Sequence, residues 1–298
     1  MPNRDAARDE PILDLFERLA LAAGAEIMDV YRTDGTVERK ADNSPVTEAD
    51  RRAERVILAG LREAYPEIPC VAEEEVSDGR LPGALGAEFI LVDPLDGTKE
   101  LVARRGDFTV NIALVRNGEP IIGVVHAPAQ AKLWSGRPGC ATSVSIGAEH
   151  APTERSKIHV AKAGAALRIV ISRSHRTPEI DAFVAQYPGA EIVSVGSSLK
   201  FCLLASGDAD LYPRFGRTME WDTAAGDAVL RAAGGKTTIM NGAPFTYGKR
   251  NQPDDVDFAN PWFIATGALE AGSFRHGRFT PARDTEIAEG GAPSSRIA

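Results

Sequence analysis

The chain has 298 residues, of which 43% are hydrophobic and 26% charged, a composition typical of a globular protein with one large or two ordinary domains. A net charge of −8 argues against a general nucleic-acid-binding protein, so we expect no nucleic-acid partner. The three widely spaced cysteines favour a reducing compartment, and neither a signal peptide nor a membrane-spanning apolar run is evident. The sequence therefore predicts a cytoplasmic protein.

The first half of the chain predicts two amphipathic helices and a series of short strands. Apolar residues recur there at helical spacing or form short β-branched runs bounded by turn residues. The expected elements are helices over 11–31 and 47–64 and strands over 37–40, 68–72, 88–92, 108–115, 120–127 and 132–135. Residues 136–156 are rich in Gly, Pro, Ser and Ala, so we predict a loop there and an N-terminal α+β domain over 1–150.

The second half alternates strand-like and helix-like segments, a pattern typical of a layered α/β unit. The expected strands are 167–172, 191–195, 209–212, 236–240 and 261–266, and the expected helices are 178–187, 198–206 and 220–233. We predict a C-terminal α/β domain over 151–285. Residues 286–298 lack periodicity and are rich in Gly, Pro and Ser, so we predict a disordered tail.

The stretch from Val92 to Glu100 carries the strongest chemical signal. It follows an apparent buried strand, and Pro94 is expected to end that strand because it has no N–H. Asp93 and Asp96 would then lie on a tight turn, with Gly97 allowing a ligand to approach the backbone. Carboxylates that bind hard cations, beside N–H groups that suit a phosphate, predict metal-assisted phosphate chemistry. The alternative is a common Pro-Xaa-Asp-Gly turn.

Three further acidic positions are candidates for the same site, and each has a structural alternative. Asp50 lies in the first turn of a helix whose N-cap is Thr47, where it fits a capping box. Glu73 opens a run of three acids that could instead be a solvated loop. Asp222 is expected in the first turn of a helix, where a carboxylate also compensates the helix dipole.

The order of these motifs resembles that of the inositol monophosphatase superfamily of Mg²⁺-dependent, lithium-sensitive phosphatases. The motifs are Glu73-Glu74, Asp93-Pro-Leu-Asp-Gly-Thr98 and Trp221-Asp-Thr-Ala-Ala-Gly226, and the likeness covers roughly Leu13 to Thr266. Further segments resemble the CysQ-type 3′(2′),5′-bisphosphate nucleotidases, namely Gly106-Asp-Phe-Thr-Val-Asn111, Ser172-Arg-Ser-His175, Gly196-Ser-Ser-Leu-Lys-Phe201 and Leu211-Tyr-Pro-Arg-Phe-Gly216. The resemblance implies an α-β-α-β-α sandwich of five layers.

The resemblance also implies a set of metal ligands and a mechanism. The implied ligands of two or three Mg²⁺ ions are Glu73, Asp93, Asp96, Asp222 and the backbone carbonyl of Leu95. Converging carboxylates would repel each other without cations, and Li⁺ is expected to inhibit. A water oriented by Thr98 and Asp50, with help from Glu73, would attack phosphorus in line. The N–H groups of Gly97 and Thr98 would stabilise the phosphoryl oxygens.

Substrate recognition is expected to lie mainly in the second half. The residues implied to contact the substrate are Leu95, Asp96, Gly97, Thr98, His175, Ser197, Lys200, Arg214 and Asp222. We place Ser197 and Lys200 on one face of a helix near its N-terminus, and expect cationic groups to bind the phosphate that is not cleaved. As alternatives, His175 could be a loop hydrogen-bonder, Lys200 a solvated residue and Arg214 part of a surface ion pair.

The implied activity is hydrolysis of the 3′-phosphate of adenosine 3′,5′-bisphosphate to AMP, with the 5′-phosphosulfate analogue as a further substrate and a link to sulfate assimilation. One alternative is a phosphatase of inositol monophosphate or another sugar phosphate. A second alternative is a non-catalytic metal- or phosphate-binding regulatory protein that kept the fold. The resemblance leaves open a homodimer and association with the cytoplasmic face of the inner membrane.

Overall fold

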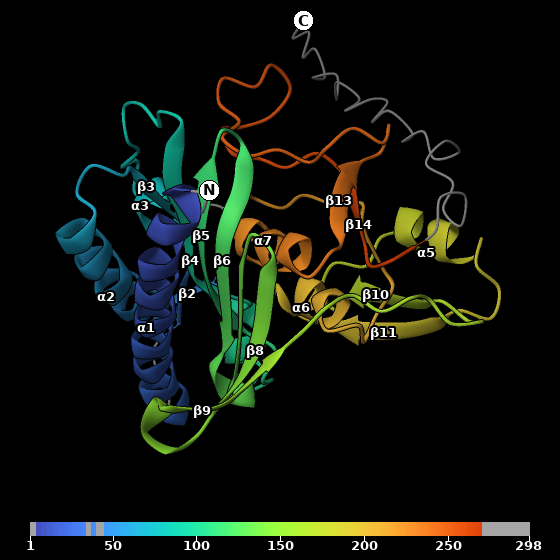
Figure 1. The fold of residues 1–298 in the computed structure, drawn as a ribbon, viewed down its shortest axis with the longest axis horizontal. Coiled ribbons are helices and arrows are strands. Elements are labelled where there is room, and N and C mark those ends of the chain that lie inside the picture. The colour runs from blue at the N-terminus through green and yellow to red at the C-terminus, as the bar shows by residue number, and fades with distance from the viewer. Residues whose placement is uncertain (1–3, 34–36, 40–44, 270–298) are drawn as a thin grey trace, which may run out of the picture.

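The computed structural model describes residues 4–33, 37–39 and 45–269, and the predicted tail at 286–298 lies outside them. Two long helices, α1 (Arg4–Arg32) and α2 (Glu48–Ala64), lie side by side on one face of the larger sheet (Figure 1). The periodicity predicted both helices, but α1 begins before Pro11 and continues through it. A short ladder of β1 (Val37–Arg39) and β2 (Pro45–Thr47) leads into α2.

The larger sheet has seven strands in the order β3-β4-β5-β6-β7-β8-β9. The strands are β3 (Cys70–Ala72), β4 (Glu88–Asp96), β5 (Thr109–Arg116), β6 (Glu119–Ala127), β7 (Lys132–Arg137), β8 (Cys140–Ile146) and β9 (Pro152–Lys157). Only β3 pairs with its neighbour in parallel; the other described pairs of this sheet are antiparallel.

The prediction of a loop over 136–156 was wrong, because this segment contains the end of β7 and the strands β8 and β9. Strand β9 is an edge strand, and all six of its residues are exposed. It therefore shows no apolar alternation from which a strand could be recognised. The predicted domain end at residue 150 falls between β8 and β9, and the division into two domains stays a prediction.

The continuous apolar run of β4 is explained by burial on both faces of the sheet. Ile90 and Val92 pack toward α1 and α2, whereas Phe89 and Leu91 pack toward the opposite face. A strand covered on both faces shows no polar alternation, which is why length and β-branched content were the useful signals here.

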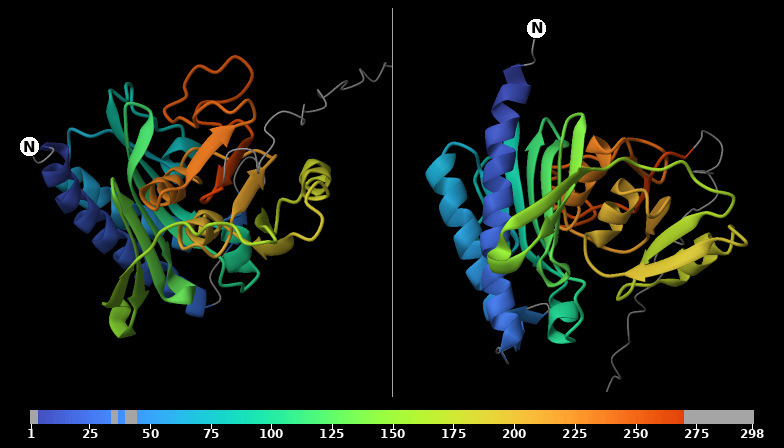
Figure 2. Two further views of the ribbon diagram at one scale, coloured as in Figure 1. Left: turned by 45° about the vertical axis from the view of Figure 1, so that its right-hand side comes forward. Right: turned by 60° about the horizontal axis from the view of Figure 1, so that its bottom comes forward.

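The smaller sheet has five strands in the order β11-β10-β12-β14-β13. Its strands are β10 (Arg168–Ser172), β11 (Glu191–Val195), β12 (Leu211–Arg214), β13 (Lys236–Ile239) and β14 (Phe263–Thr266). Helices α6 (Leu199–Ala205) and α7 (Ala224–Ala232) lie between the two sheets (Figure 2), and α5 (Pro178–Val184) covers the far face with Ile180 and Phe183. The five-layered α-β-α-β-α sandwich is confirmed.

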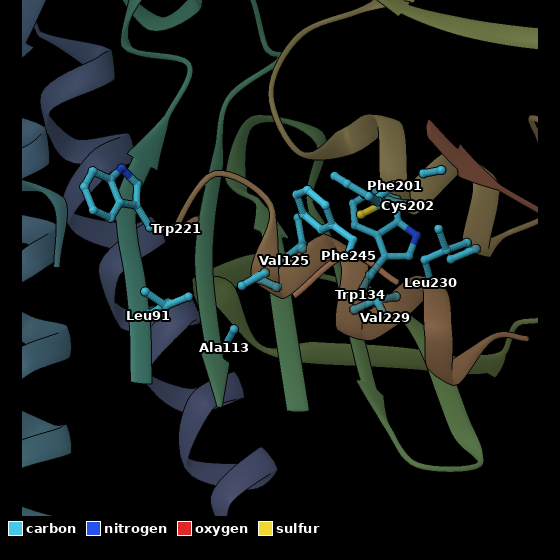
Figure 3. Packing of buried hydrophobic residues seen from close by; sticks show 14 of the residues in the cluster. Leu91, Ala113, Val125, Trp134, Phe201, Cys202, Trp221, Val229, Leu230 and Phe245 are labelled. Atoms are coloured by element: carbon cyan, nitrogen blue, oxygen red, sulfur yellow. The ribbon is translucent and has the colours of Figure 1, made fainter. Parts of the chain in front are cut away.

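The layer between the sheets is the largest apolar core. Figure 3 shows Leu91, Ala113 and Val125 of the larger sheet facing side chains of α6 and α7. Phe201 of α6 packs edge-on against Tyr212 of the smaller sheet, with ring centroids 5.3 Å apart. This core fixes the two sheets against each other, so groups at the edges of both sheets hold a constant separation.

Three short helices complete the elements near the site. Helix α3 (Glu73–Ser77) follows β3, and α4 (Thr98–Val102) follows β4. Helix α7 begins at Ala224, whereas the sequence placed its start at Glu220. Residues 220–223 form turns instead, so Asp222 precedes the helix and does not lie in its first turn.

Candidate active site

Strand β4 passes through Pro94 and ends at Asp96, so the prediction that the strand stops before Pro94 was wrong. Asp93 pairs with Asn111 of β5, and the ladder resumes where Asp96 pairs with Thr109, with an irregularity between the two pairs. The missing N–H of Pro94 is tolerated because the residue lies in this bulged stretch. The bulge leaves both aspartates at the end of the same strand.

Gly97 provides the sharp change of direction after the strand. Its φ of 94° lies in the left-handed region, which glycine adopts without strain. A Cβ atom at this position would lie 3.0 Å from the backbone oxygen of Asp107. The turn therefore requires glycine, and it places Thr98 at the start of α4.

Asp50 joins helix capping to the site. One carboxylate oxygen, Oδ2, accepts hydrogen bonds of 2.7 Å from both the N–H and the hydroxyl of Thr47, which completes the predicted capping box. The other oxygen, Oδ1, accepts a bond of 3.1 Å from the hydroxyl of Thr98. The capping role and the position beside the central turn are thus compatible.

The backbone of the central turn is fixed by its own acid. The N–H of Leu95 donates to Oδ1 of Asp93 at 3.0 Å, and the Leu95 carbonyl accepts a bond of 3.3 Å from the Thr98 hydroxyl. Asp93 is only 1% exposed. A buried carboxylate held in this way presents its second oxygen in a fixed direction.

Glu73 arrives beside this turn through the parallel pairing of β3 and β4. Ala72 is in register with Val92, so the next residues, Glu73 and Asp93, emerge at the same end of the two strands. The acidic run 73–75 forms the first turn of α3 and is therefore not a solvated loop. The N–H of Glu74 donates to Oε2 of Glu54 at 2.9 Å, which fixes the start of α3 against α2.

Asp222 reaches the site from the turn that precedes α7, in the layer between the two sheets. Its Oδ2 accepts a hydrogen bond of 2.8 Å from the N–H of Met219, and the Asn260 amide donates to the carbonyl of Met219 at 2.7 Å. Loss of hydration, followed by the negative charges of Asp96 and Glu73, raises the pKa of Asp222 well above its ordinary value. The structure thus brings Asp222, Asp96 and Glu73 within electrostatic range of one another.

This donor set suits a hard divalent cation. Carboxylate oxygens from three separate segments repel each other, and a cation with oxygen ligands relieves that repulsion. Within the described ranges, no three acidic, histidine or cysteine side chains are close enough to form a metal-binding group by themselves. The Leu95 carbonyl, which accepts the bond from Thr98, is a further oxygen atom in the same turn.

The prediction that Ser197 and Lys200 share a helix face was wrong, because α6 begins only at Leu199. Ser197 has a φ of 54°, which is uncommon for a residue other than glycine, and its hydroxyl donates to Oδ2 of Asp96 at 2.9 Å. Lys200 is buried, donates to the carbonyl of Ser197, and lies with Nζ 5.4 Å from the ring centroid of Tyr212. It is therefore not a solvated helix residue.

The cationic groups that face this region are Lys200 and Arg214. Loss of hydration lowers the pKa of Lys200 to about 8, which leaves it mostly protonated at neutral pH. Arg214 is 5% exposed and donates to the carbonyl of Arg217 at 2.8 Å, so it is not part of a surface ion pair. Its Nε is buried without a hydrogen-bond partner among the described residues.

His175 differs from these two residues. Its side chain is exposed, yet its pKa is lowered to about 4, first by partial loss of hydration and then by the charges of Arg214 and Lys99. The family resemblance places His175 among the residues that would contact the nucleotide. At neutral pH it is uncharged, and it can bind only as a hydrogen-bonding group.

Several residues that shape the site were not identified from the sequence as site residues. The most important are Glu100, Asp107, Asn111, Ser198 and Asn260. Glu100 accepts a hydrogen bond from Ser174, and Asp107 accepts one of 3.2 Å from the N–H of Gly196. All of these except Asn260 lie inside segments already named from the sequence. The spacing of those segments, however, gives no sign of hydrogen-bond partners more than 70 residues away.

The chain belongs to the inositol monophosphatase family, whose sequence profile matches residues 8–271. Members of this family are generally metal-dependent. Within the family the chain is similar to the 3′(2′),5′-bisphosphate nucleotidase CysQ of Escherichia coli K12, with 46% identity over 256 residues, which cover 85% of this chain and 98% of the relative. CysQ of Salmonella typhimurium is 43% identical over 257 residues, covering 86% of this chain and 99% of that protein.

Solved structures give the same result. CysQ from Bacteroides thetaiotaomicron is 36% identical and superposes with a TM-score of 0.67, covering 85% of this chain and 95% of that chain. The IMPase of Thermotoga maritima is 26% identical with a TM-score of 0.68, covering 86% and 92%. The family resemblance predicted from the motifs is confirmed. In the described part of the chain, every helix is too short or too polar to cross a bilayer.

Proposed function

We propose that the protein is a Mg²⁺-dependent phosphomonoesterase that hydrolyses the 3′-phosphate of adenosine 3′,5′-bisphosphate to give AMP and inorganic phosphate. The observation that carries this proposal is the convergence of acids and buried cations. Asp96 and Asp222 influence each other electrostatically, and the buried cations Lys200 and Arg214 lie within electrostatic range of them. A substrate with two phosphates needs acids that hold cations at the phosphate to be cleaved, and cationic side chains that bind the other phosphate.

Glu73, Asp93, Asp96, Asp222 and the Leu95 carbonyl would hold the cations. When bound, these ions polarise the phosphoryl oxygens and lower the pKa of water. The chain's own contribution begins with Thr98, whose hydroxyl donates to Asp50 at 3.1 Å and can accept a proton from the attacking water. Water oxygen then bonds to phosphorus while the bond to the ribose 3′-oxygen breaks, and that oxygen takes up a proton.

Asp50 is well placed to accept the proton that Thr98 passes on. Its Oδ2 is already held by two hydrogen bonds from Thr47, so the carboxylate cannot rotate away from Thr98. Lys200 and Arg214 would bind the 5′-phosphate as charge-assisted donors, and the unpartnered Nε of Arg214 offers one such hydrogen bond. His175 would contact the nucleotide as a neutral group.

The proposal extends to the 5′-phosphosulfate analogue, because that compound carries the same 3′-phosphate as adenosine 3′,5′-bisphosphate. It also extends to a place in sulfate assimilation. The homodimer and the contact with the inner membrane stay predictions from the sequence.

A substrate panel tests the proposal. Phosphate release by purified protein should be faster from adenosine 3′,5′-bisphosphate than from inositol 1-phosphate, should require Mg²⁺ and should fall when Li⁺ is added. Faster release from inositol phosphate would favour a sugar-phosphate phosphatase, and no release from either would favour a regulatory protein. Arg214→Ala should remove most of the preference for the bisphosphate.

A further inference from the structure

Ser198 is a buried serine that contacts both the larger sheet and the turn before α7. It is 2% exposed, and its Oγ lies 2.6 Å from the carbonyl oxygen of Asp222 and 3.1 Å from Oδ2 of Asp96. Asp96 ends a strand of the larger sheet, whereas Asp222 belongs to the turn before α7. One hydroxyl therefore contacts both the carboxylate of Asp96 and the backbone of Asp222, which belong to different elements of the fold.

The orientation of this hydroxyl is set by Asn111. The amide Nδ2 of Asn111 donates to Oγ of Ser198 at 3.0 Å, and the amide oxygen accepts a bond of 3.1 Å from the hydroxyl of Thr109. Because the amide hydrogen occupies one lone pair of Oγ, the single hydroxyl hydrogen is left to point toward Asp222 or Asp96. Asn111 is 1% exposed and is itself paired with Asp93 across the β4–β5 ladder.

The local structure around Ser198 departs from the usual behaviour of its residue type. Ser198 is the N-cap of α6, where serine normally accepts a hydrogen bond from a backbone N–H of the first turn. Its side chain makes no capping bond within the described helix and turns toward the site instead. The preceding residue, Ser197, has a left-handed φ of 54°. Departures of this kind concentrate at functional sites, where a contact elsewhere compensates for them.

We infer that Ser198 is a positioning residue that fixes the separation of Asp96 and Asp222, and with it the affinity of the site for divalent cations. The inference rests on the proposed function, because it assigns both acids to the same cation site. Groups one layer behind metal ligands orient those ligands and tune their affinity. Asn111 contributes by holding the Ser198 hydroxyl.

Direct binding of Mn²⁺, followed by electron paramagnetic resonance on the full chain without substrate, tests this inference. Ser198→Ala should weaken the dissociation constant about 10- to 100-fold, the range typical of such second-layer changes. Asn111→Ala should weaken it less. The double variant should bind within about twofold of Ser198→Ala, because residues that act in series are not additive.

Ser135→Ala is the matched control. Ser135 is also 2% exposed, and its hydroxyl bonds to that of Thr142 at 2.9 Å within the larger sheet, away from the site. This variant loses a buried hydroxyl of the same kind, so its thermal stability should fall comparably. Its Mn²⁺ affinity should stay within about twofold of the unmodified protein, because no metal-facing residue loses a partner.

The outcomes separate two failures. If the unmodified protein binds Mn²⁺ and Ser198→Ala binds it equally well, or Ser135→Ala loses as much affinity, the positioning role is wrong and the proposed function stands. If the unmodified protein binds no Mn²⁺, both are wrong. If Ser198→Ala fails to fold by circular dichroism, Asn111→Ala decides, and an unchanged dissociation constant for that variant overturns the inference.

Discussion

The acids of the site and the residues that face the substrate are held by different kinds of contact. Asp50, Asp93 and Asp222 each accept a hydrogen bond from a backbone N–H no more than three residues away. Ser174 and Ser197 donate to carboxylates 74 and 101 residues away. These three acids are thus placed by turns that form locally, whereas the segments that carry Ser174 and Ser197 take their positions only once the two sheets have packed.

Asp96 is a proposed metal ligand whose carboxylate also accepts the long-range bonds of Ser197 and Ser198, so Asp96→Asn should have the largest effect. Losing one carboxylate charge removes several kcal/mol of charge stabilisation, and we expect kcat to fall on the order of 1,000-fold. The measurement is phosphate release from adenosine 3′,5′-bisphosphate under saturating Mg²⁺. Asp257→Asn is a suitable control, since that carboxylate bonds to Arg250 at 3.1 Å outside the site. Unchanged release by Asp96→Asn would rule out the metal mechanism.

A substitution at His126 tests how the packing of β6 against α1 contributes to stability, without changing a residue of the site. It is fully buried in β6, its Nδ1 lies 2.9 Å from the Ala20 carbonyl of α1, and burial lowers its pKa to about 4. Below pH 6.5 the unfolded chain binds a proton that the folded chain excludes, so stability falls as the pH drops from about 6.5 toward 4.

Through His126 alone, the free energy of unfolding should fall by about 3 kcal/mol over that window, because each unit of pKa difference corresponds to 1.36 kcal/mol. Urea unfolding at several pH values measures it. In His126→Gln this part of the pH dependence should disappear, because glutamine does not titrate. An identical pH profile for both proteins would show that folding does not lower the pKa of His126.

Gly196→Ala should disturb the long-range contacts while sparing the acids. A Cβ atom there would lie 2.8 Å from the backbone oxygen of Asp107 and 3.1 Å from Cγ of Glu100, so the segment carrying Ser197 must shift. We expect KM for the bisphosphate to rise about tenfold, with a smaller change for p-nitrophenyl phosphate, which lacks the second phosphate. Gly83→Ala, where a Cβ atom meets nothing within 4 Å, should leave both substrates unaffected.

Thr47→Ala should have the smallest effect, because it removes only the local support of Asp50. Loss of an N-cap side chain typically costs about 1 kcal/mol of stability. The activity should fall several-fold because Oδ2 of Asp50 also loses the hydroxyl bond of 2.7 Å. Thr47→Ser keeps the hydroxyl and should restore both thermal stability and kcat. If the alanine and serine variants have equal activity, the Thr47 hydroxyl contributes to helix capping but not to catalysis.

The same contrast explains what the sequence could predict. The capping box of Thr47 and Asp50 and the turn at Gly97 depend on neighbouring residues, so their patterns were readable. The five layers followed from the family resemblance, whereas the periodicity predicted the individual helices. The boundary of α7 was less accessible, because residues 220–223 form hydrogen-bonded turns that mimic a helix start.

The long-range part of the site could not be read in this way. The bonds of Ser198 to Asp96 and to the carbonyl of Asp222 depend on how closely the two sheets pack. The low pKa of His175 depends on partial loss of hydration and then on the charges of Arg214 in β12 and Lys99 in α4, which are distant in sequence. Strand β9 was missed for another reason, since an exposed edge strand needs no apolar residues.

The order of strands in the smaller sheet has a consequence for synthesis on the ribosome. Strand β14 (263–266) is inserted between β12 and β13, so β13 has no described sheet neighbour except β14. Arg214 of β12 pairs directly with Phe263 of β14. The sheet position of Arg214, the residue proposed to bind the 5′-phosphate, therefore cannot be completed until nearly the whole described chain has emerged from the exit tunnel. A nascent polypeptide stalled before residue 263 would carry the acidic turns but would lack strand β14, which pairs with Arg214 of β12.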